Sequence, residues 1–369
     1  MRIYLVVASI NELVNLYEIR DNKHEIKVIV VDEGDGLLRD KNKGLLSNLD
    51  VNFYGPRERI EWFRTMDGSA SDDFASVIPG KCHAETSFGF LVACEEDAEV
   101  IIEIDDDVKV VNKSFIDNHL DNLYSCEGIT IISGNKWYNT IDNLKLDTDD
   151  NIFPRGHPYD LATRSRDYRI TGGSPDCVLN MGVWGGQPDL DALTILSHGG
   201  LDGRCNINSK AYNEEKVIAG KGTYFAICSM NASFRRKVIP AFYQLYMRYM
   251  DIDRFDDILS GIFLKKIADH LGDKICLGKP IVIHDKRPRD TWKDLRAELE
   301  GMIINESLWR IIDALELSGN DYHESYCELA EDLEKSIDKF QYKIQRDFMK
   351  VQIEKMKLWL KIIDKLNRG

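Results

Sequence analysis

The stretch VIIEIDDDVKV, residues 100–110, decides the fold, because an apolar run of strand length passes directly into three consecutive carboxylates. An unpaired carboxylate is costly to bury, so this transition indicates the end of a buried strand. In an extended chain, Asp105 and Asp107 point to the same side. Oxygen ligands suit Mg²⁺ or Mn²⁺, and Mg²⁺ is usually shared with substrate phosphates. The stretch therefore predicts a divalent metal site at a strand end; the alternative is a solvated acidic turn.

The residues before this stretch alternate between strand and helix patterns. Ile3–Ala8 and Ile26–Val31 are short apolar runs, typical of strands buried on both faces. Residues 11–19 and 84–98 carry apolar side chains at helical spacing. This order predicts an α/β fold with a doubly wound, mostly parallel sheet, in which ligands bind beyond the carboxyl ends of the strands. Two acidic segments fall at those ends: DEGDG at 32–36 and DDD at 105–107.

The middle of the chain, residues 134–220, is rich in Gly, Asn, Asp and Pro. This composition predicts irregular loops that shape a substrate site and close over it as a lid. Helical spacing returns at 254–271, with Gly272 placed to end the helix. Ile281–Ile283 is interpreted as a short strand that delivers His284.

Apolar residues from Tyr326 to Leu366 recur at three- and four-residue steps, which predicts one or two amphipathic helices. Their polar face carries both Glu and Lys, so packing on the body or on another subunit is favoured over a membrane surface. We therefore expect a catalytic domain over 1–300, a helical extension over 301–369, and a homo-oligomer formed through these helices.

Composition excludes several classes of protein. The 369 residues include 48 Lys and Arg against 62 Asp and Glu, a net charge of −14, which argues against a nucleic-acid-binding protein. No apolar stretch is long enough for a membrane span, and the N-terminus lacks a secretory pattern. The eight cysteines are scattered without a C-x-x-C pair, so reduced cysteines and a cytoplasmic protein are expected.

Other segments add candidate site residues, each with a less specific alternative. His284 is a candidate third metal ligand or a surface-turn histidine, and Lys286 follows it as a candidate phosphate contact. Asp256 and Asp257 are candidate bases or an acidic cluster that the helix dipole favours. Arg155, between two prolines, is a candidate functional arginine or part of a surface ion pair.

Trp184 could stack on a sugar or simply fill the core. The phosphate-binding G-x-x-x-x-G-K-[ST] loop, the dinucleotide fingerprint, G-x-S-x-G and H-E-x-x-H are all missing from the sequence, which disfavours those chemistries.

Taken in order, these motifs resemble the reversibly glycosylated polypeptide family, whose plant members are UDP-arabinopyranose mutases. The resemblance spans nearly the whole chain. Its motifs are DDD at 105–107, RGHP at 155–158, the segment 184–191 that ends in PDLD, KGTYFAICSMNASF at 221–234, RFDD at 254–257, DHLG at 269–272, IVIHDK at 281–286 and WLKIIDKLN at 359–367.

The resemblance implies a GT-A type fold, a UDP-sugar substrate, and Mn²⁺ or Mg²⁺ held by Asp105, Asp107 and His284. It also implies pyranose–furanose interconversion with reversible self-glycosylation on an arginine, and Arg155 matches that position. The second functional arginine of the family falls on Ala162 here, and Arg164 is the nearest candidate. The expected nucleotide-sugar contacts are Ala8, Ser9, Asp32, Glu33, Gly34, Lys81, Asp106, Trp184, Asn231 and Lys286.

Two other functions remain open from the sequence. A glycosyltransferase that moves the sugar to an external acceptor would use the same metal and nucleotide site but an open groove. The loss of an arginine at Ala162 favours that transferase, whereas the RGHP loop at 155–158 favours the mutase. A self-glycosylated scaffold that acts through its C-terminal helices is the third possibility, and the retained acidic motifs argue against it.

Overall fold

The structure is a computed structural model that describes all residues except 17–18, 20–22, 67–70, 112, 214 and 369. Within the described residues, thirteen strands form one mixed sheet, whose main path has the order β3-β2-β1-β4-β12-β9-β13-β11-β6-β8. The strands are β1 (Arg2–Ser9), β2 (Glu25–Asp32), β3 (Asp50–Tyr54), β4 (Val100–Ile104), β5 (Val108–Val110), β6 (Ile129–Ser133), β7 (Leu144–Leu146), β8 (Tyr168–Gly172), β9 (Leu179–Gly186), β10 (Ser209–Tyr212), β11 (Val217–Ala219), β12 (Asn231–Arg235) and β13 (Ile275–His284).

The N-terminal strands pair in parallel, as their continuous apolar sequences predicted. β1 lies between β2 and β4, with Val6 opposite Ile29 and Glu103. Along the main path, β3, β2, β1, β4, β9, β13 and β8 run in one direction, and β12, β11 and β6 run in the other. The α/β class and the mixed, mostly parallel sheet are therefore confirmed.

The sheet edge at the end of β4 gathers the acidic segments. β1 and β2 end at this edge with Ser9 and Asp32, and Asp105 directly follows the end of β4. The last residue of β13, His284, lies opposite Val108 of β5, the first residue after the DDD segment. Strand register therefore delivers His284 to the acidic edge, as the sequence predicted.

Helices cover both faces of the sheet. Asn231 and Phe234 on β12 point to opposite faces, because they are three residues apart in an extended strand. Asn231 contacts His119 of α5, and Phe234 contacts Phe90 of α4 with ring centroids 5.0 Å apart. The helices are α1 (Gly36–Leu45), α2 (Pro56–Met66), α3 (Ser71–Ala75), α4 (Thr86–Glu95), α5 (Phe115–Tyr124), α6 (Ala192–Ser197), α7 (Asp256–Leu271), α8 (Thr291–Asp313), α9 (Tyr322–Lys335) and α10 (Lys343–Leu366), with 3₁₀ turns η2 (His83–Glu85), η3 (Thr140–Asn143), η4 (Leu161–Thr163), η5 (Arg236–Ala241) and η6 (Ile337–Lys339).

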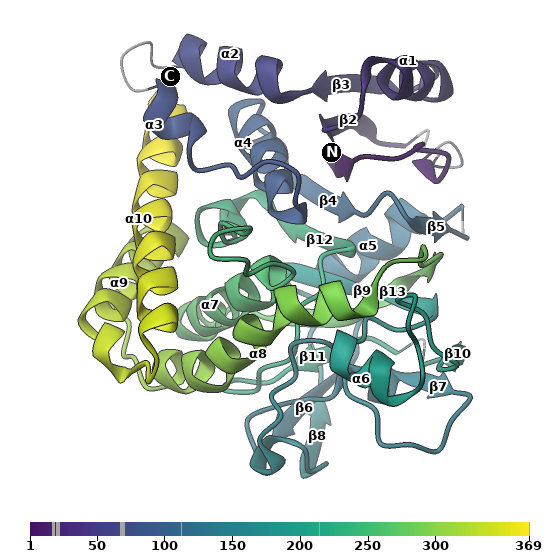
Figure 1. The fold of residues 1–369 in the computed structure, drawn as a ribbon, viewed down its shortest axis with the longest axis vertical. Helices are drawn as coiled ribbons and strands as arrows, with labels where there is room; N and C mark the ends of the chain where they lie inside the picture. Colours follow the sequence, from purple (N-terminus) through teal and green to yellow (C-terminus); the bar gives the residue numbers. More distant parts are fainter. Residues whose placement is uncertain (17–18, 20–22, 67–70, 112, 214, 369) are drawn as a thin grey trace.

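The C-terminal helices α9 and α10 confirm the predicted amphipathic pair and pack on the body of the protein. α10 runs along one flank of the molecule and reaches α3, and it also contacts α4 and α9 (Figure 1). Met356 and Trp359 on its buried face are fully enclosed. Helix α8 continues across residues 300 and 301, where the sequence analysis divided the chain. The two-domain division and oligomerisation through these helices stay predictions.

Two expectations were wrong in detail. The described residues of 11–19 form turns in place of a helix, because Leu13 N–H bonds to the Asn42 side chain and Leu16 N–H to the Leu13 carbonyl. The region 134–220 contains more regular structure than expected, since it includes β9, a central strand paired with both β12 and β13. No helix among the described residues is both long and apolar enough to span a membrane.

Candidate functional site

The first two carboxylates of the acidic segment fix neighbouring loops. Asp106 accepts hydrogen bonds from the backbone N–H of Ile10 at 3.0 Å and from Asn11 Nδ2 at 2.9 Å, so it anchors the residues that follow β1. Asp105 turns the other way, and its Oδ1 lies 3.0 Å from Nε2 of His83. Adjacent positions therefore face different sides of the site, as successive residues in an extended chain do.

Asp107 lies beside His284, with 3.8 Å between Oδ2 and Nε2. Among the described residues, Asp107 Oδ1 is buried without a hydrogen-bond partner. Burial, and then the charges of Asp105 and Asp106, raise the pKa of Asp107 to about 7. His284 faces the backbone carbonyl of Gln187 through Nδ1 at 3.1 Å, which leaves Nε2 directed at Asp107.

This pair fits a divalent cation, which would relieve the unpartnered oxygen and the clustered negative charge. The described part of the chain contains no ready-made group of three metal-binding side chains. Asp107 and His284 would therefore form only part of a coordination shell. Mg²⁺ sites of this kind are usually completed by water and substrate phosphates.

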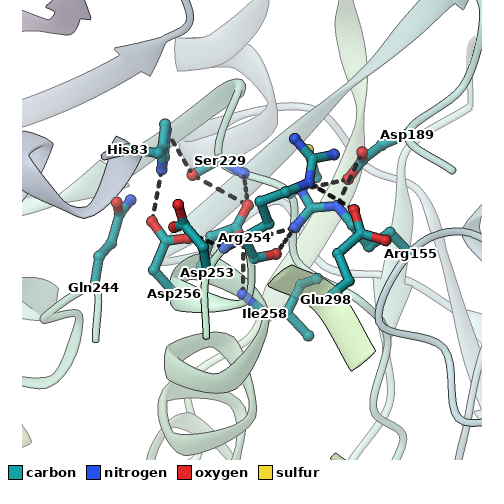
Figure 2. A network of polar contacts seen from close by, with 12 residues as sticks. His83, Arg155, Asp189, Ser229, Gln244, Asp253, Arg254, Asp256, Ile258 and Glu298 are labelled. Carbon is teal, nitrogen blue, oxygen red and sulfur yellow. Dashed lines mark hydrogen bonds and ion pairs between the residues drawn. The ribbon is translucent and has the colours of Figure 1, made fainter. Parts of the chain in front are cut away.

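His83 is a central residue that the sequence analysis missed. Its Nδ1 lies 2.8 Å from Oδ2 of Asp256, and its Nε2 faces Asp105 and, at 3.4 Å, Glu103. Burial alone would lower the pKa of His83, but the charges of Asp105 and Asp256 raise it well above the ordinary value. His83 therefore joins the DDD segment to the RFDD segment as a charged bridge. Figure 2 shows its contact with Asp256. No motif surrounds it in the sequence.

Arg155 is held by two carboxylates, those of Asp189 and Asp257. Its Nε and Nη2 donate to the two oxygens of Asp189 at 3.1 and 2.9 Å, and its Nη1 donates to the backbone carbonyl of Arg254. Asp257 Oδ1 lies 3.8 Å from Nη1. Burial would raise the pKa of Asp189, but Arg155 lowers it to about 2. Burial raises the pKa of Asp257 to about 6, although Arg155 opposes that shift.

The RGHP loop reaches this position through a tight contact with α7. Gly156 has φ +87°, and a Cβ at that position would lie 2.5 Å from Cγ2 of Ile258. Only glycine combines this backbone conformation with this approach. The Gly156 carbonyl also accepts a hydrogen bond from Asn305 Nδ2 at 2.8 Å, which ties the loop to α8.

A cavity of about 300 Å³ joins these groups. Nine of the predicted residues line it: Ala8, Ser9, Lys81, Asp105, Asp106, Asp107, Arg155, Asp256 and Asp257. The sequence analysis missed other lining residues, among them His83, Glu85, Asp253, Arg254 and Arg289. The cavity is therefore rich in both carboxylates and cations.

The predicted residues at the end of β2 make polar contacts with α1, α2 and the η2 turn. Glu33 and Glu85 both bind Arg59 of α2, and burial raises the pKa of Glu85 to about 9. Asp32 pairs with Arg39 at 3.4 Å and accepts from the backbone N–H of Gly34. These contacts shape the loop that follows β2.

Lys286 is buried among the residues after β13, and no described residue accepts a hydrogen bond from its Nζ.

Eight of the seventeen predicted residues do not line the cavity: Asp32, Glu33, Gly34, Arg164, Trp184, Asn231, His284 and Lys286. Trp184 is 2% exposed in the core, which favours the core alternative for it. Arg164 stacks on the rings of Phe153 and Tyr159, at 4.5 and 4.1 Å, and donates to the Pro158 carbonyl.

Asn231 is fully buried and bonds to His119 and to the Pro280 carbonyl. Its polar side chain thus satisfies a core network, which the sequence pattern could not distinguish from a ligand contact.

Comparisons with known proteins agree with the sequence resemblance. The family described as reversibly glycosylated polypeptide matches residues 3–368. A probable UDP-arabinopyranose mutase 1 of Solanum tuberosum is 30% identical over 79% of this chain and 74% of its own length. UDP-arabinopyranose mutase 1 of Arabidopsis thaliana is 27% identical over 79% of this chain and 76% of its own. Glucosyl-3-phosphoglycerate synthase of Mycobacterium tuberculosis, a solved structure, aligns with a TM-score of 0.42 and 12% identity over 86% of this chain and 80% of its own.

The family match extends over almost every residue of the chain, and it includes the DDD, RGHP and RFDD segments that meet at the cavity. The chain therefore belongs to the reversibly glycosylated polypeptide family.

Proposed function

We propose that this protein is a metal-dependent mutase that interconverts the pyranose and furanose forms of a UDP-sugar, with reversible glycosylation of an arginine. The observation that carries the proposal is the meeting of Arg155 with Asp105 and Asp107 in one cavity. The proposed metal-dependent reaction needs a metal site next to a sugar site. Relatives named UDP-arabinopyranose mutase support the same reaction.

Asp107 and His284 would hold Mn²⁺ or Mg²⁺, with Asp105 as a further ligand if it exchanges its contact with His83. The metal would supply charge neutralisation of the diphosphate, which makes UDP a better leaving group. Ala8, Ser9 and the loop at 32–34 would contact the base and ribose at the ends of β1 and β2. Lys81, Asp106 and Lys286 complete the proposed nucleotide-sugar contacts.

The proposed reaction breaks the bond between the anomeric carbon and the β-phosphate oxygen, and UDP leaves with the electron pair. Arg155 then bonds to the anomeric carbon, and its displaced proton passes to Asp257, which lies 3.8 Å away. The ring oxygen leaves as a hydroxyl and another hydroxyl of the same sugar closes the new ring. UDP finally displaces the arginine, which takes its proton back, so the sequence is an isomerisation with no net change of oxidation state.

A specific contact favours the second candidate, a glycosyltransferase with an external acceptor. A guanidinium is a poor nucleophile because it keeps its proton. Burial would lower the pKa of Arg155, but the charges of Asp189 and Asp257 outweigh burial and raise that pKa further. In that reaction Arg155 would orient the donor sugar without being glycosylated. The two functions share the metal and the nucleotide site and differ in the fate of the sugar.

The deciding experiment incubates purified protein with Mn²⁺ and radiolabelled UDP-sugars in the absence of any acceptor. A mutase yields an isomeric UDP-sugar, and label on the protein disappears when excess UDP is added. Arg155→Lys should abolish both signals, whereas Arg166→Lys, an exposed arginine nearby, should abolish neither. Release of UDP only after an acceptor is added would identify a transferase, and no turnover with any UDP-sugar would refute both.

A further inference from the structure

Three cations gather beside the cavity on the side of α8. Arg254 precedes α7, and Lys286 and Arg289 lie in the segment between β13 and α8. Arg254 and Arg289 line the cavity. Lys286 follows the proposed metal ligand His284 by two residues. The cluster therefore continues the proposed metal site toward Arg155.

Two carboxylates of α8 hold the arginines from behind. Glu298 Oε1 lies 2.6 Å from Nε of Arg254, and Asp294 Oδ2 lies 2.8 Å from Nε of Arg289. Residues four apart share a helix face, so one face of α8 supports both guanidinium groups. Each arginine is bound through Nε, and among the described residues none accepts a hydrogen bond from Nη1 or Nη2 of either.

Lys286 provides an independent sign that a ligand is missing from this cluster. It is nine-tenths buried, and no described residue accepts a hydrogen bond from its Nζ. An unpaired buried ammonium is costly, so a counter-ion is needed in the working protein. The carboxylates whose charges act on Lys286 are already paired, Glu298 with Arg254 and Asp189 with Arg155.

The backbone of Arg254 supports the same interpretation. Its φ is +67°, a conformation that residues other than glycine rarely adopt. Strain of this kind persists where the surroundings impose it, often at ligand sites. Here the Arg254 carbonyl accepts from Arg155 Nη1, while the Arg254 side chain binds Glu298 (Figure 2). Arg254 thus connects Arg155 to Glu298 of α8.

We propose that Arg254, Lys286 and Arg289 form an anion-binding subsite that receives the diphosphate of the nucleotide-sugar. Asp189 occupies Nε and Nη2 of Arg155, whereas the outer nitrogens of Arg254 and Arg289 remain available, and guanidinium groups match phosphate geometry. The identity of the ligand rests on the proposed function. The positive cluster itself does not.

The test compares the binding of UDP, uridine and inorganic pyrophosphate by isothermal titration calorimetry, with Mn²⁺ present. In the double variant Arg254→Met/Glu298→Gln, both charges of the buried pair are removed together, so no buried carboxylate is left alone. We expect UDP and pyrophosphate to bind about tenfold more weakly or worse, since a charge-assisted hydrogen bond is lost, and uridine to bind unchanged.

A matched control is Arg235→Met/Asp176→Asn. The Arg235 side chain is 17% exposed, the same as Arg254, and it also pairs with a carboxylate, but it lies outside the cavity. This control should bind all three compounds like the wild type. Arg289→Met, at a side chain that is 43% exposed, provides a second variant in case the first does not fold, and it should weaken UDP and pyrophosphate in the same direction.

The possible results separate the two proposals. Unchanged pyrophosphate and UDP affinity in Arg289→Met and in the folded double variant would overturn the subsite, as would a wild type that binds neither compound. Equal weakening of uridine and UDP would also overturn it, because the loss would then lie at the nucleoside. Weakened pyrophosphate binding in a protein that converts no UDP-sugar would refute the proposed function and leave the subsite standing.

Discussion

Arg155 and Asp189 form a bidentate ion pair, in which Nε and Nη2 of the arginine lie 3.1 and 2.9 Å from the two carboxylate oxygens. Both residues are buried, at 8% and 4% exposure. A buried pair is favourable only while both partners are present, because a lone buried charge is left without compensation. The arginine expected to carry function is thus also a structural element of its loop.

Asp189→Ala should therefore lower the free energy of unfolding by about 3–5 kcal/mol, the usual cost of removing one partner of a buried pair. Urea denaturation followed by circular dichroism measures this. Asp142→Ala, which removes the partner of the more exposed Arg166, should cost no more than about 1 kcal/mol. Equal losses in the two variants would show that the Arg155 pair is solvated in solution.

Asp107→Asn tests the proposed metal site independently of activity. Even changes behind the ligands cost about 10- to 100-fold in metal affinity, so loss of a ligand should weaken Mn²⁺ binding at least that much. Electron paramagnetic resonance of free Mn²⁺ gives the affinity. Asp285→Asn is the control, because that carboxylate is 61% exposed and pairs with Lys109. Unaltered Mn²⁺ affinity in Asp107→Asn would remove Asp107 from the site.

Strand patterns in the sequence were enough to predict the parallel N-terminal strands and the edge at which the site lies. Ile3–Ala8, Ile26–Val31 and Val100–Ile104 are mostly apolar, with Lys27 and Glu103 as their charged residues, and they do not alternate regularly, which is typical of strands buried on both faces. Their acidic ends then had to meet at one edge. The position of His284 was also predictable, because it follows a short apolar run directly.

The residues that the sequence analysis missed act through partners far away in the chain. His83 gains its role from Asp256, 173 residues away, and Arg254 gains its role from Glu298 on helix α8. Neither contact leaves a local pattern. Trp184 shows the converse problem, since an aromatic residue next to glycines is compatible with both a sugar platform and a core position.

Trp184→Leu distinguishes those two roles. Because the side chain is 2% exposed, the smaller residue leaves a cavity, and we expect a loss of stability of about 2–4 kcal/mol. The affinity for UDP-sugar, measured by calorimetry at a temperature where the variant is folded, should not change. A weaker affinity at full stability would instead place the indole against the sugar.

His119 makes stability depend on pH. It is fully buried between Asn231 and Asn180, and burial lowers its pKa to about 3. Between that value and the ordinary pKa near 6.5, the unfolded chain binds a proton that the folded chain does not, so stability falls as pH falls.

The His119→Gln variant should lack this contribution. At about 1.4 kcal/mol per pH unit, the wild type should lose about 2–3 kcal/mol more than the variant between pH 7 and pH 4.5. Urea unfolding at each pH measures the difference, and His198→Gln, at a partly exposed histidine, should follow the wild type. We do not expect His119 to be protonated in the folded protein, because its Nδ1 faces the amide donor of Asn180. If the plots of unfolding free energy against pH were parallel for His119→Gln and the wild type, His119 would have to be protonated in the folded protein.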